Sequence, residues 1–511
     1  MTTTLNPLPT IPALTVKNGQ SVALDAIPVL SYGAFSSEVL RLLSDPQNHC
    51  VNYYAFPDQG GLKFIAATAN DGGSGAIYLL SHETPMDIQR LDSLTKSNLA
   101  LHIYEREIAE NFGIEFVGHP WAKPVRYAHD RADRSKTLRN YPFFKITGEE
   151  IHEVPVGPIH AGVIEPGHFR FMCNGETVLH LEIQLGYQHR GIEKLFLQKK
   201  TLIQRTVLAE CIAGDTAIGH NLAFVQNMES LAGIRVSDNL QLLRTLALEI
   251  ERLAMHTWGL SNLGVGIAYQ LGNSVIGALR TPVINYMQWW CGNRFGKGLL
   301  RVGCNQYPFT AELKTRLLDL LDEYEAKYTE IAAEYFDLPS VQAPLEKTGT
   351  VTQEQMRLIG AVGMSARITG IPRDIRQSHP TGFYEKQRYE TVTEQSGDVW
   401  ARAMLRNREV QKSLAYIRLL LENVTTDGAE TERVAVVLEP NQFSIALTEA
   451  WRGEVCHCAV TDASGELAHY KVKDPSVHNW LALGLAVRDN EISDFPICNK
   501  TFDLSYCGND L

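Results

Sequence analysis

Two stretches with apolar residues at helical spacing constrain the fold of this 511-residue chain most strongly. Between residues 239 and 256, one helical face collects the apolar side chains Leu242, Leu243, Leu246, Ile250 and Leu253. Arg244 and Glu251 fall on another face of the same stretch. The spacing recurs at i, i+4, i+7 and i+11 with Leu317, Leu321, Tyr324 and Tyr328. This period is typical of amphipathic helices, so the chain is expected to contain a helical bundle with a shared core.

The first 150 residues have a different pattern. Leu62–Thr68 and Gly75–Ser81 are predicted as short strands, and Asn70–Gly73 between them as a turn. Ser36–Ser44 is predicted as a helix. The polar stretch His129–Arg139 is typical of a linker or an extended arm.

These patterns predict an α+β protein with a small N-terminal α/β domain and a mostly helical second domain. The expected boundaries are 1–35 for an N-terminal extension, 36–128 for the small domain, 129–150 for the linker and 151–511 for the helical domain. Two strand-like segments are expected within the last of these, at Val434–Leu438 and Glu454–Val460.

Composition excludes several classes of function. The net charge of −11 is opposite to that of a typical nucleic-acid-binding protein. No apolar run approaches the roughly 18–20 residues that span a bilayer, and no signal peptide is predicted from the first residues. Nine scattered cysteines indicate a reducing compartment rather than a disulfide framework. Because no two cysteines are separated by two residues, the chain is not expected to hold an iron–sulfur cluster.

Residues 104–120 (YEREIAENFGIEFVGHP) are dense in charge and end a helical pattern at Gly113. Composition alone favours a surface helix with solvated charges. The string nevertheless resembles the signature of the 30-kDa subunit of respiratory complex I, with Glu110 in place of an aspartate. The resemblance implies a structural segment that docks neighbouring subunits.

Residues 157–170 (GPIHAGVIEPGHFR) are predicted to form a hairpin rich in glycine and proline that carries His160, Glu165 and His168. Such a hairpin suits a polar loop at a ligand pocket, although histidines in loops are more often simply exposed. The string resembles the start of the large subunit of group 4 membrane-bound hydrogenases. More distantly it resembles the 49-kDa subunit of complex I, in which this hairpin reaches into the quinone headgroup site.

Residues 186–195 (GYQHRGIEKL) give the strongest single match to the same two families. The resemblance implies that Glu193 relays protons, as the matching hydrogenase glutamate does. A carboxylate within a bundle can carry a proton if burial raises its pKa toward neutrality. The equally weighted alternative is an internal ion-pair network of His189, Arg190 and Glu193.

Two further segments resemble the hydrogenase metal-binding motifs with their metal ligands removed. They are residues 211–220 (CIAGDTAIGH) and 503–511 (DLSYCGNDL). The four cysteine ligands of a nickel–iron centre are expected at positions that here hold Ala213, Thr216, Ser505 and Gly508. A nickel–iron centre needs soft thiolates, and these residues supply none. Cys211 and Cys507 each lie close to one of these positions in the sequence, but two thiols do not replace four.

His220 is retained from the hydrogenase motif, and the resemblance to complex I places it at a tyrosine that hydrogen-bonds a quinone carbonyl. The alternative is a core histidine with its bonds satisfied. Further matches include Gly370–Arg376, which contains Asp374, and extend the similarity over about residues 40–511. The candidate catalytic residues are Glu193, His220 and Asp374. The candidate pocket residues are His160, Glu165, His168, His189, Arg190 and Asp215.

The whole pattern resembles a fusion of 30-kDa-like and 49-kDa-like domains, as in the large subunits of formate hydrogenlyase and hydrogenase-4 complexes. The resemblance implies a peripheral subunit on the cytoplasmic side of the inner membrane. Implied partners are a small subunit with a [4Fe-4S] cluster, a ferredoxin-like subunit and antiporter-like membrane subunits. The chain itself is expected to hold no nickel–iron centre. Three roles stay open: a quinone-type pocket lined by His168, Glu193, His220 and Asp374; a silent coupling subunit; or a hydrogenase with atypical ligands.

Overall fold

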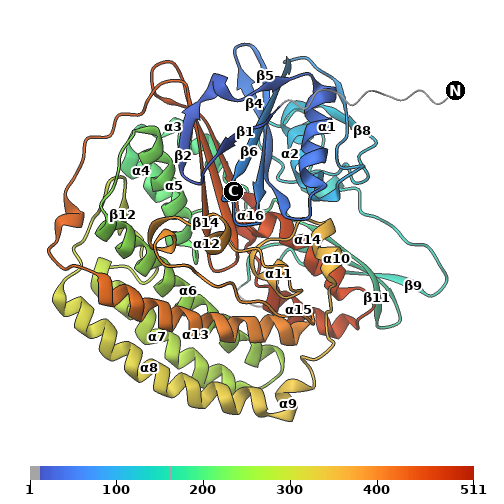
Figure 1. The fold of residues 1–511 in the computed structure, drawn as a ribbon. Helices are drawn as coiled ribbons and strands as arrows, with labels where there is room; N and C mark the ends of the chain where they lie inside the picture. Colours follow the sequence, from blue (N-terminus) through green and yellow to red (C-terminus); the bar gives the residue numbers. More distant parts are fainter. Residues whose placement is uncertain (1–11, 161–163) are drawn as a thin grey trace.

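The computed structural model describes residues 12–160 and 164–511 and is a mixed α+β protein, as predicted. The N-terminal part is built on an antiparallel sheet in the order β1-β6-β5-β4, with β3 parallel to β6. Its strands are β1 (Leu14–Val16), β3 (Val29–Leu30), β4 (Asn48–Asp58), β5 (Gly61–Asn70) and β6 (Ile77–Pro85). Helices α1 (Tyr32–Leu43) and α2 (His102–Phe112) accompany the sheet (Figure 1). The strands predicted at 62–68 and 75–81 and the helix at 36–44 are therefore confirmed.

A second antiparallel sheet combines the beginning of the chain with its last quarter, in the order β16-β15-β14-β2. Its strands are β2 (Gln20–Ala23), β14 (Gln442–Glu449), β15 (Glu454–Thr461) and β16 (Leu467–Lys473). Residues 12–35, within the expected N-terminal extension, thus supply strands to both sheets. The predicted strand at 454–460 is confirmed. The one at 434–438 is wrong, because within the described chain no strand pairs with it, and Val437 remains 79% exposed.

The two sheets share one core, so the two predicted domains are not independent. Val51, Tyr54 and Ile65 of the first sheet pack with Ile445 and Leu447 of the second. A buried ion pair also joins the sheets, since His49 lies 2.9 Å from the carboxylate of Asp71 and 2.7 Å from that of Glu454.

Long helices form the bundle that the apolar periodicity predicts. They are α5 (Ala217–Leu231), α6 (Asp238–Gly266), α7 (Gln270–Cys291), α8 (Ala311–Asp337) and α13 (Val399–Asn423). In Figure 1, α6, α7, α8 and α13 lie side by side below the sheets. The predicted apolar face of α6 is buried, and so are Leu317, Leu321, Tyr324 and Tyr328 of α8. None of the described helices is both long and apolar enough to cross a bilayer.

The remaining elements are short and surround the bundle. A third sheet has the order β11-β10-β9. Its strands are β9 (Ile151–Val156), β10 (His168–Asn174) and β11 (Thr177–Gln184). Two small pairs are β7 (Arg90–Asp92) with β8 (Glu115–Val117), and β12 (Leu300–Arg301) with β13 (Cys304–Asn305). The short helices are α3 (Ile192–Gln198), α4 (Leu202–Ala209), α9 (Pro339–Gln342), α10 (Gln353–Leu358), α11 (Gly363–Arg367), α12 (Ile375–Ser378), α14 (Ser476–Val487), α15 (Phe495–Phe502) and α16 (Tyr506–Asp510).

Helix α2 contradicts the interpretation of residues 104–112 as a surface helix with solvated charges. Glu105 and Arg106 are buried. The Glu105 carboxylate accepts bonds of 2.7 Å from Leu94 N and from the Thr95 hydroxyl, and Arg106 donates to the carbonyls of Lys123 and Pro124. The charges therefore fix loops of the same chain. The helix ends where expected, at Gly113 with φ of 75°.

Candidate functional site

Arg190 connects the two segments that resemble emptied metal motifs. Its guanidinium donates to the carbonyls of Cys211 and Ile212 at 2.6 and 2.9 Å, and to that of Cys507 at 2.8 Å. The loop before α5 and helix α16 thus meet, although they are about 300 residues apart. All four expected ligand positions, Ala213, Thr216, Ser505 and Gly508, are buried. We call this region the candidate site.

An ion pair occupies the candidate site. Arg452, which follows β14, contacts both carboxylate oxygens of Asp215 at 2.6 and 2.7 Å and also donates to the Thr216 hydroxyl at 3.2 Å. A further bond of 2.5 Å to the carbonyl of Asp503 ties it to the C-terminal segment. Burial alone would lower the pKa of Arg452, but the neighbouring carboxylates hold it above its usual value. Two parallel bonds of this kind are the strong form of an arginine–carboxylate pair.

Asp474 occupies the space into which a side chain at position 508 would project. A Cβ added to Gly508 would lie 2.6 Å from both Cγ and Oδ2 of Asp474 and 2.9 Å from Oγ of Ser505. Ser505 serves as the N-cap of α16, because its hydroxyl accepts the backbone N–H of Gly508 at 2.9 Å. Both positions thus have structural roles that need no metal.

His220 on α5 faces the same carboxylate. Its Nε2 lies 3.0 Å from Oδ2 of Asp474, and its Nδ1 lies 3.1 Å from Nε2 of His457 on β15. Burial alone would raise the pKa of Asp474, but His220 and Arg452 hold it below its usual value. The His220 side chain is fully buried.

Glu165, on the segment before β10, lies beside Cys507 of α16 at the edge of the candidate site. Burial raises the pKa of the Cys507 thiol to about 11, and the Glu165 carboxyl beside it adds to the shift. The two histidines of the hairpin bond its own backbone instead. Nε2 of His160 lies 3.1 Å from the Gly167 carbonyl, and Nδ1 of His168 lies 3.0 Å from the Gly157 carbonyl.

Glu193 and His189 line a cavity of about 40 Å³ that also borders Glu107 of α2. That volume has room for water. The Glu193 carboxylate accepts the Val472 N–H at 3.0 Å and pairs with Lys471 at 3.0 Å. His189 donates from Nδ1 to the Asp510 carbonyl at 2.7 Å. His189, Arg190 and Glu193 therefore have separate partners rather than one common network.

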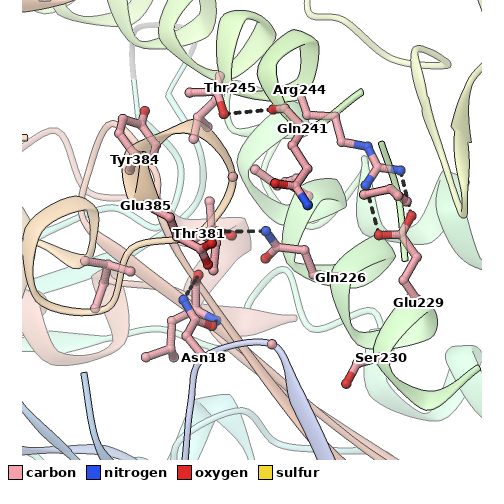
Figure 2. A pocket seen from close by; sticks show the side chains of 18 of the residues that line it. Asn18, Gln226, Glu229, Ser230, Gln241, Arg244, Thr245, Thr381, Tyr384 and Glu385 are labelled. Atoms are coloured by element: carbon pink, nitrogen blue, oxygen red, sulfur yellow. Dashed lines mark hydrogen bonds and ion pairs between the residues drawn. The ribbon is translucent and has the colours of Figure 1, made fainter. Parts of the chain in front are cut away.

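Asp374 belongs to a different buried cluster. It pairs with Arg376 at 2.7 Å, and Arg376 pairs with Glu409 at 2.9 Å. This cluster borders a cavity of about 350 Å³ between α5, α6 and the loop after α12 (Figure 2), where Arg244 faces Glu229 and Gln226 faces Thr381. The four residues expected to line a quinone-type pocket thus each have a separate set of partners: His168, Glu193, His220 and Asp374.

Sequence reasoning missed two residues of the candidate site, Arg452 and Glu251. In the sequence, Arg452 marks only a turn, and Glu251 only a charge on the polar side of a helix. The Glu251 carboxyl accepts the N–H groups of Ile218 and Gly219 at 2.8 and 3.1 Å, at the start of α5. Burial raises its pKa to about 8. No local signal in the sequence singles it out, because Glu249 and Arg252 of the same helix are buried as well.

Residues 274–446 match the family model described as respiratory-chain NADH dehydrogenase, 49 Kd subunit. Hydrogenase-4 component G of Escherichia coli (strain K12) is 26% identical over 426 residues, covering 80% of this chain and 73% of that protein. The C/D subunit of the NADH-quinone oxidoreductase of Bacteroides thetaiotaomicron is 26% identical over 468 residues, covering 82% and 87%. The chain is therefore a distant relative of both.

A chain from a solved structure has the same fold. It comes from the membrane-bound sulfane sulfur reductase, an archaeal respiratory membrane complex, and superposes with a TM-score of 0.67 at 19% identity. The match covers 72% of this chain and 100% of that one.

Proposed function

We propose that this chain is a peripheral, cytoplasmic subunit of a membrane-bound oxidoreductase complex that couples electron transfer to ion translocation. Similarity to a hydrogenase-4 component and to part of an NADH-quinone oxidoreductase supports this proposal. The proposed partners are an iron–sulfur small subunit with a [4Fe-4S] cluster, a ferredoxin-like subunit and antiporter-like membrane subunits. Contact with the membrane would run through these partners alone, and no nucleic acid takes part.

The residues of the candidate site do not fit a nickel–iron centre. Such a centre needs soft thiolate ligands, whereas the four positions hold Ala213, Thr216, Ser505 and Gly508. The observation that carries this conclusion is the carboxylate of Asp474, which fills the space beside Gly508. Cys507 does not compensate, because burial holds its thiol protonated, with a pKa of about 11.

The charges that fill the site support a coupling role. The Arg452–Asp215 pair bonds both halves of the site, so a change in its protonation would act on the α5 loop and the C-terminal segment together. A quinone-type substrate is the second candidate, favoured by the position of Glu165 at the edge of the site. Such a substrate would have to displace Arg452 or Asp474.

The first experiment is purification of the tagged chain from detergent-solubilised membranes. We expect stoichiometric partners, among them one with cysteine motifs for a [4Fe-4S] cluster and one with membrane-spanning segments. Recovery of the chain alone, with no such partner after crosslinking, would contradict the proposal.

A second experiment separates coupling from substrate binding. The complex in proteoliposomes is supplied with reduced methyl viologen as electron donor and a soluble quinone as acceptor, and electron turnover is measured together with ion transport. Asp215→Asn is expected to retain electron turnover and to lose ion transport. The control is Asp322→Asn, which removes an exposed partner of Arg418 and should change neither. Loss of electron turnover in Asp215→Asn would favour the substrate pocket instead.

A further inference from the structure

Four buried side chains form an unbroken hydrogen-bonded row that ends at the candidate site. Oδ2 of Asp474 lies 3.0 Å from Nε2 of His220, and Nδ1 of His220 lies 3.1 Å from Nε2 of His457. Nδ1 of His457 lies 2.8 Å from the hydroxyl of Tyr470 on β16. All four residues are at most 1% exposed, so solvent does not interrupt the row.

The row has a single direction when Asp474 is ionised. An ionised carboxylate only accepts hydrogen bonds, and a neutral imidazole has one donor and one acceptor nitrogen. His220 therefore donates from Nε2 to Asp474 and accepts at Nδ1 from Nε2 of His457. His457 in turn accepts at Nδ1 from the hydroxyl of Tyr470. Every bond in the row is satisfied with both rings neutral.

The surroundings favour this arrangement over a charged histidine. Burial lowers the pKa of His457 well below its ordinary value. His220 accepts a bond at Nδ1, so a second ring proton there would face the N–H of His457. On the other side, Oδ1 of Asp474 accepts the Ser476 N–H at 2.8 Å, which fixes the carboxylate with Oδ2 toward His220.

We propose that His457 and Tyr470 are positioning residues of the candidate site, which keep the ring proton of His220 on Nε2 and thereby hold the Asp474 carboxylate in place beside Gly508. Neither residue touches the space beside Gly508, and both act through His220. A ligand that enters the candidate site would have to displace Asp474 or present a hydrogen-bond donor or a positive charge to it. This inference rests on the proposed function only for the identity of that ligand.

His220 and His457 therefore each have one defined tautomer, and a substitution of Asp474 should change both. Asn at position 474 keeps the shape of aspartate. Its carbonyl oxygen would stay on the Ser476 N–H and its amide would donate to Nε2 of His220. His220 must then carry its proton on Nδ1 and donate to His457, which must also move its proton to Nδ1. Asp474→Asn should therefore change the tautomer of both histidines from Nε2–H to Nδ1–H.

The experiment is ¹⁵N NMR of the full chain with labelled histidine, assigned by single His→Gln variants. The wild-type chain should show neutral His220 and His457, both protonated on Nε2, with a ¹⁵N–¹⁵N coupling across their shared hydrogen bond. Asp474→Asn should move both protons to Nδ1. In His457→Leu, the ¹⁵N shift of His220 Nδ1 should move to that of a ring nitrogen without a hydrogen bond, while Nε2 keeps its proton on the bond to Asp474.

The control is Asp71→Asn, which alters another buried aspartate that bonds a histidine, His49. It should leave His220 and His457 unchanged. A doubly protonated His220 in the wild-type chain, or a His457 tautomer that ignores Asp474→Asn, would overturn the proposal. So would an Nδ1 signal of His220 that does not change in His457→Leu. These signals come from the chain itself, so they are independent of whether the complex transports ions.

Discussion

Gly508→Ala tests whether the candidate site has room for a side chain at the former ligand position. The added methyl group would lie 2.6 Å from Cγ and Oδ2 of Asp474, whereas carbon atoms in contact are about 3.5–4.0 Å apart. The methyl group therefore fits only if Asp474 moves. Because Asp474 bonds His220 and the Ser476 N–H, its movement disrupts the row described above.

The expected loss of stability follows from three contributions. Overpacking a tight interior costs about 1–3 kcal/mol. Loss of a hydrogen bond to a charged group costs about 1.5–3 kcal/mol. Alanine is favoured over glycine within a helix by about 1 kcal/mol, and Gly508 lies in α16. The net prediction is a decrease of roughly 2–4 kcal/mol in the free energy of unfolding.

The assay is urea denaturation of the purified chain, with Gly214→Ala as the matched control. Gly214 lies in the facing loop of the same site, and an added Cβ there meets no atom within 4 Å. Its substitution should change stability by less than about 0.5 kcal/mol. In an Asp474→Ala background, the cost of Gly508→Ala should largely disappear. A Gly508→Ala protein as stable as the wild type would refute the reasoning.

Three further predictions concern charged groups. Arg452→Met leaves Asp215 without its partner and should lower the free energy of unfolding by about 3 kcal/mol. This is the lower end of the range for a broken buried pair, because the Asp215 side chain is 35% exposed. An unchanged midpoint in urea denaturation would contradict the prediction. The carboxylates of Asp71 and Glu454 outweigh burial and raise the pKa of His49. The stability that protonated His49 contributes is complete below about pH 6.5 and is lost as pH rises through the folded pKa. The loss of stability caused by His49→Gln, measured by denaturation across pH, should therefore be smaller at high pH than at low pH. Burial raises the pKa of Glu251 to about 8. The wild-type chain should therefore lose stability as pH rises from about 4.5 to 8, by up to about 1.4 kcal/mol per pH unit. Glu251→Gln should remove that slope, and a variant with the same pH profile as the wild type would argue against the prediction.

Local patterns predicted the helices well, because each helix buries a face that its own sequence defines. The predicted apolar positions of α6 and α8 are buried, and α2 ends at its glycine. Helix α6 also buries Arg244 and Glu251, which its apolar pattern does not predict. The wrong strand at 434–438 shows the limit of local reasoning, since β-branched residues form a strand only where another strand pairs with them.

Contacts between distant segments lay outside the reach of the sequence. Strand β2 pairs with β14 about 420 residues later, and nothing in either segment specifies that pairing. Glu105 is charged and buried because loops of the same domain satisfy it. The ligand positions could be located by motif, whereas the Arg452–Asp215 pair that fills the site joins residues 237 positions apart.

The most direct test of the central claim is metal analysis of the purified complex for nickel and iron, with hydrogen uptake measured on the same sample. The account predicts no stoichiometric nickel, no hydrogen turnover, and iron that matches only the clusters of the partner subunits. Stoichiometric nickel together with hydrogen turnover would contradict it, and would mean that Cys211, Cys507 or other groups bind a metal in the space now assigned to Arg452 and Asp474.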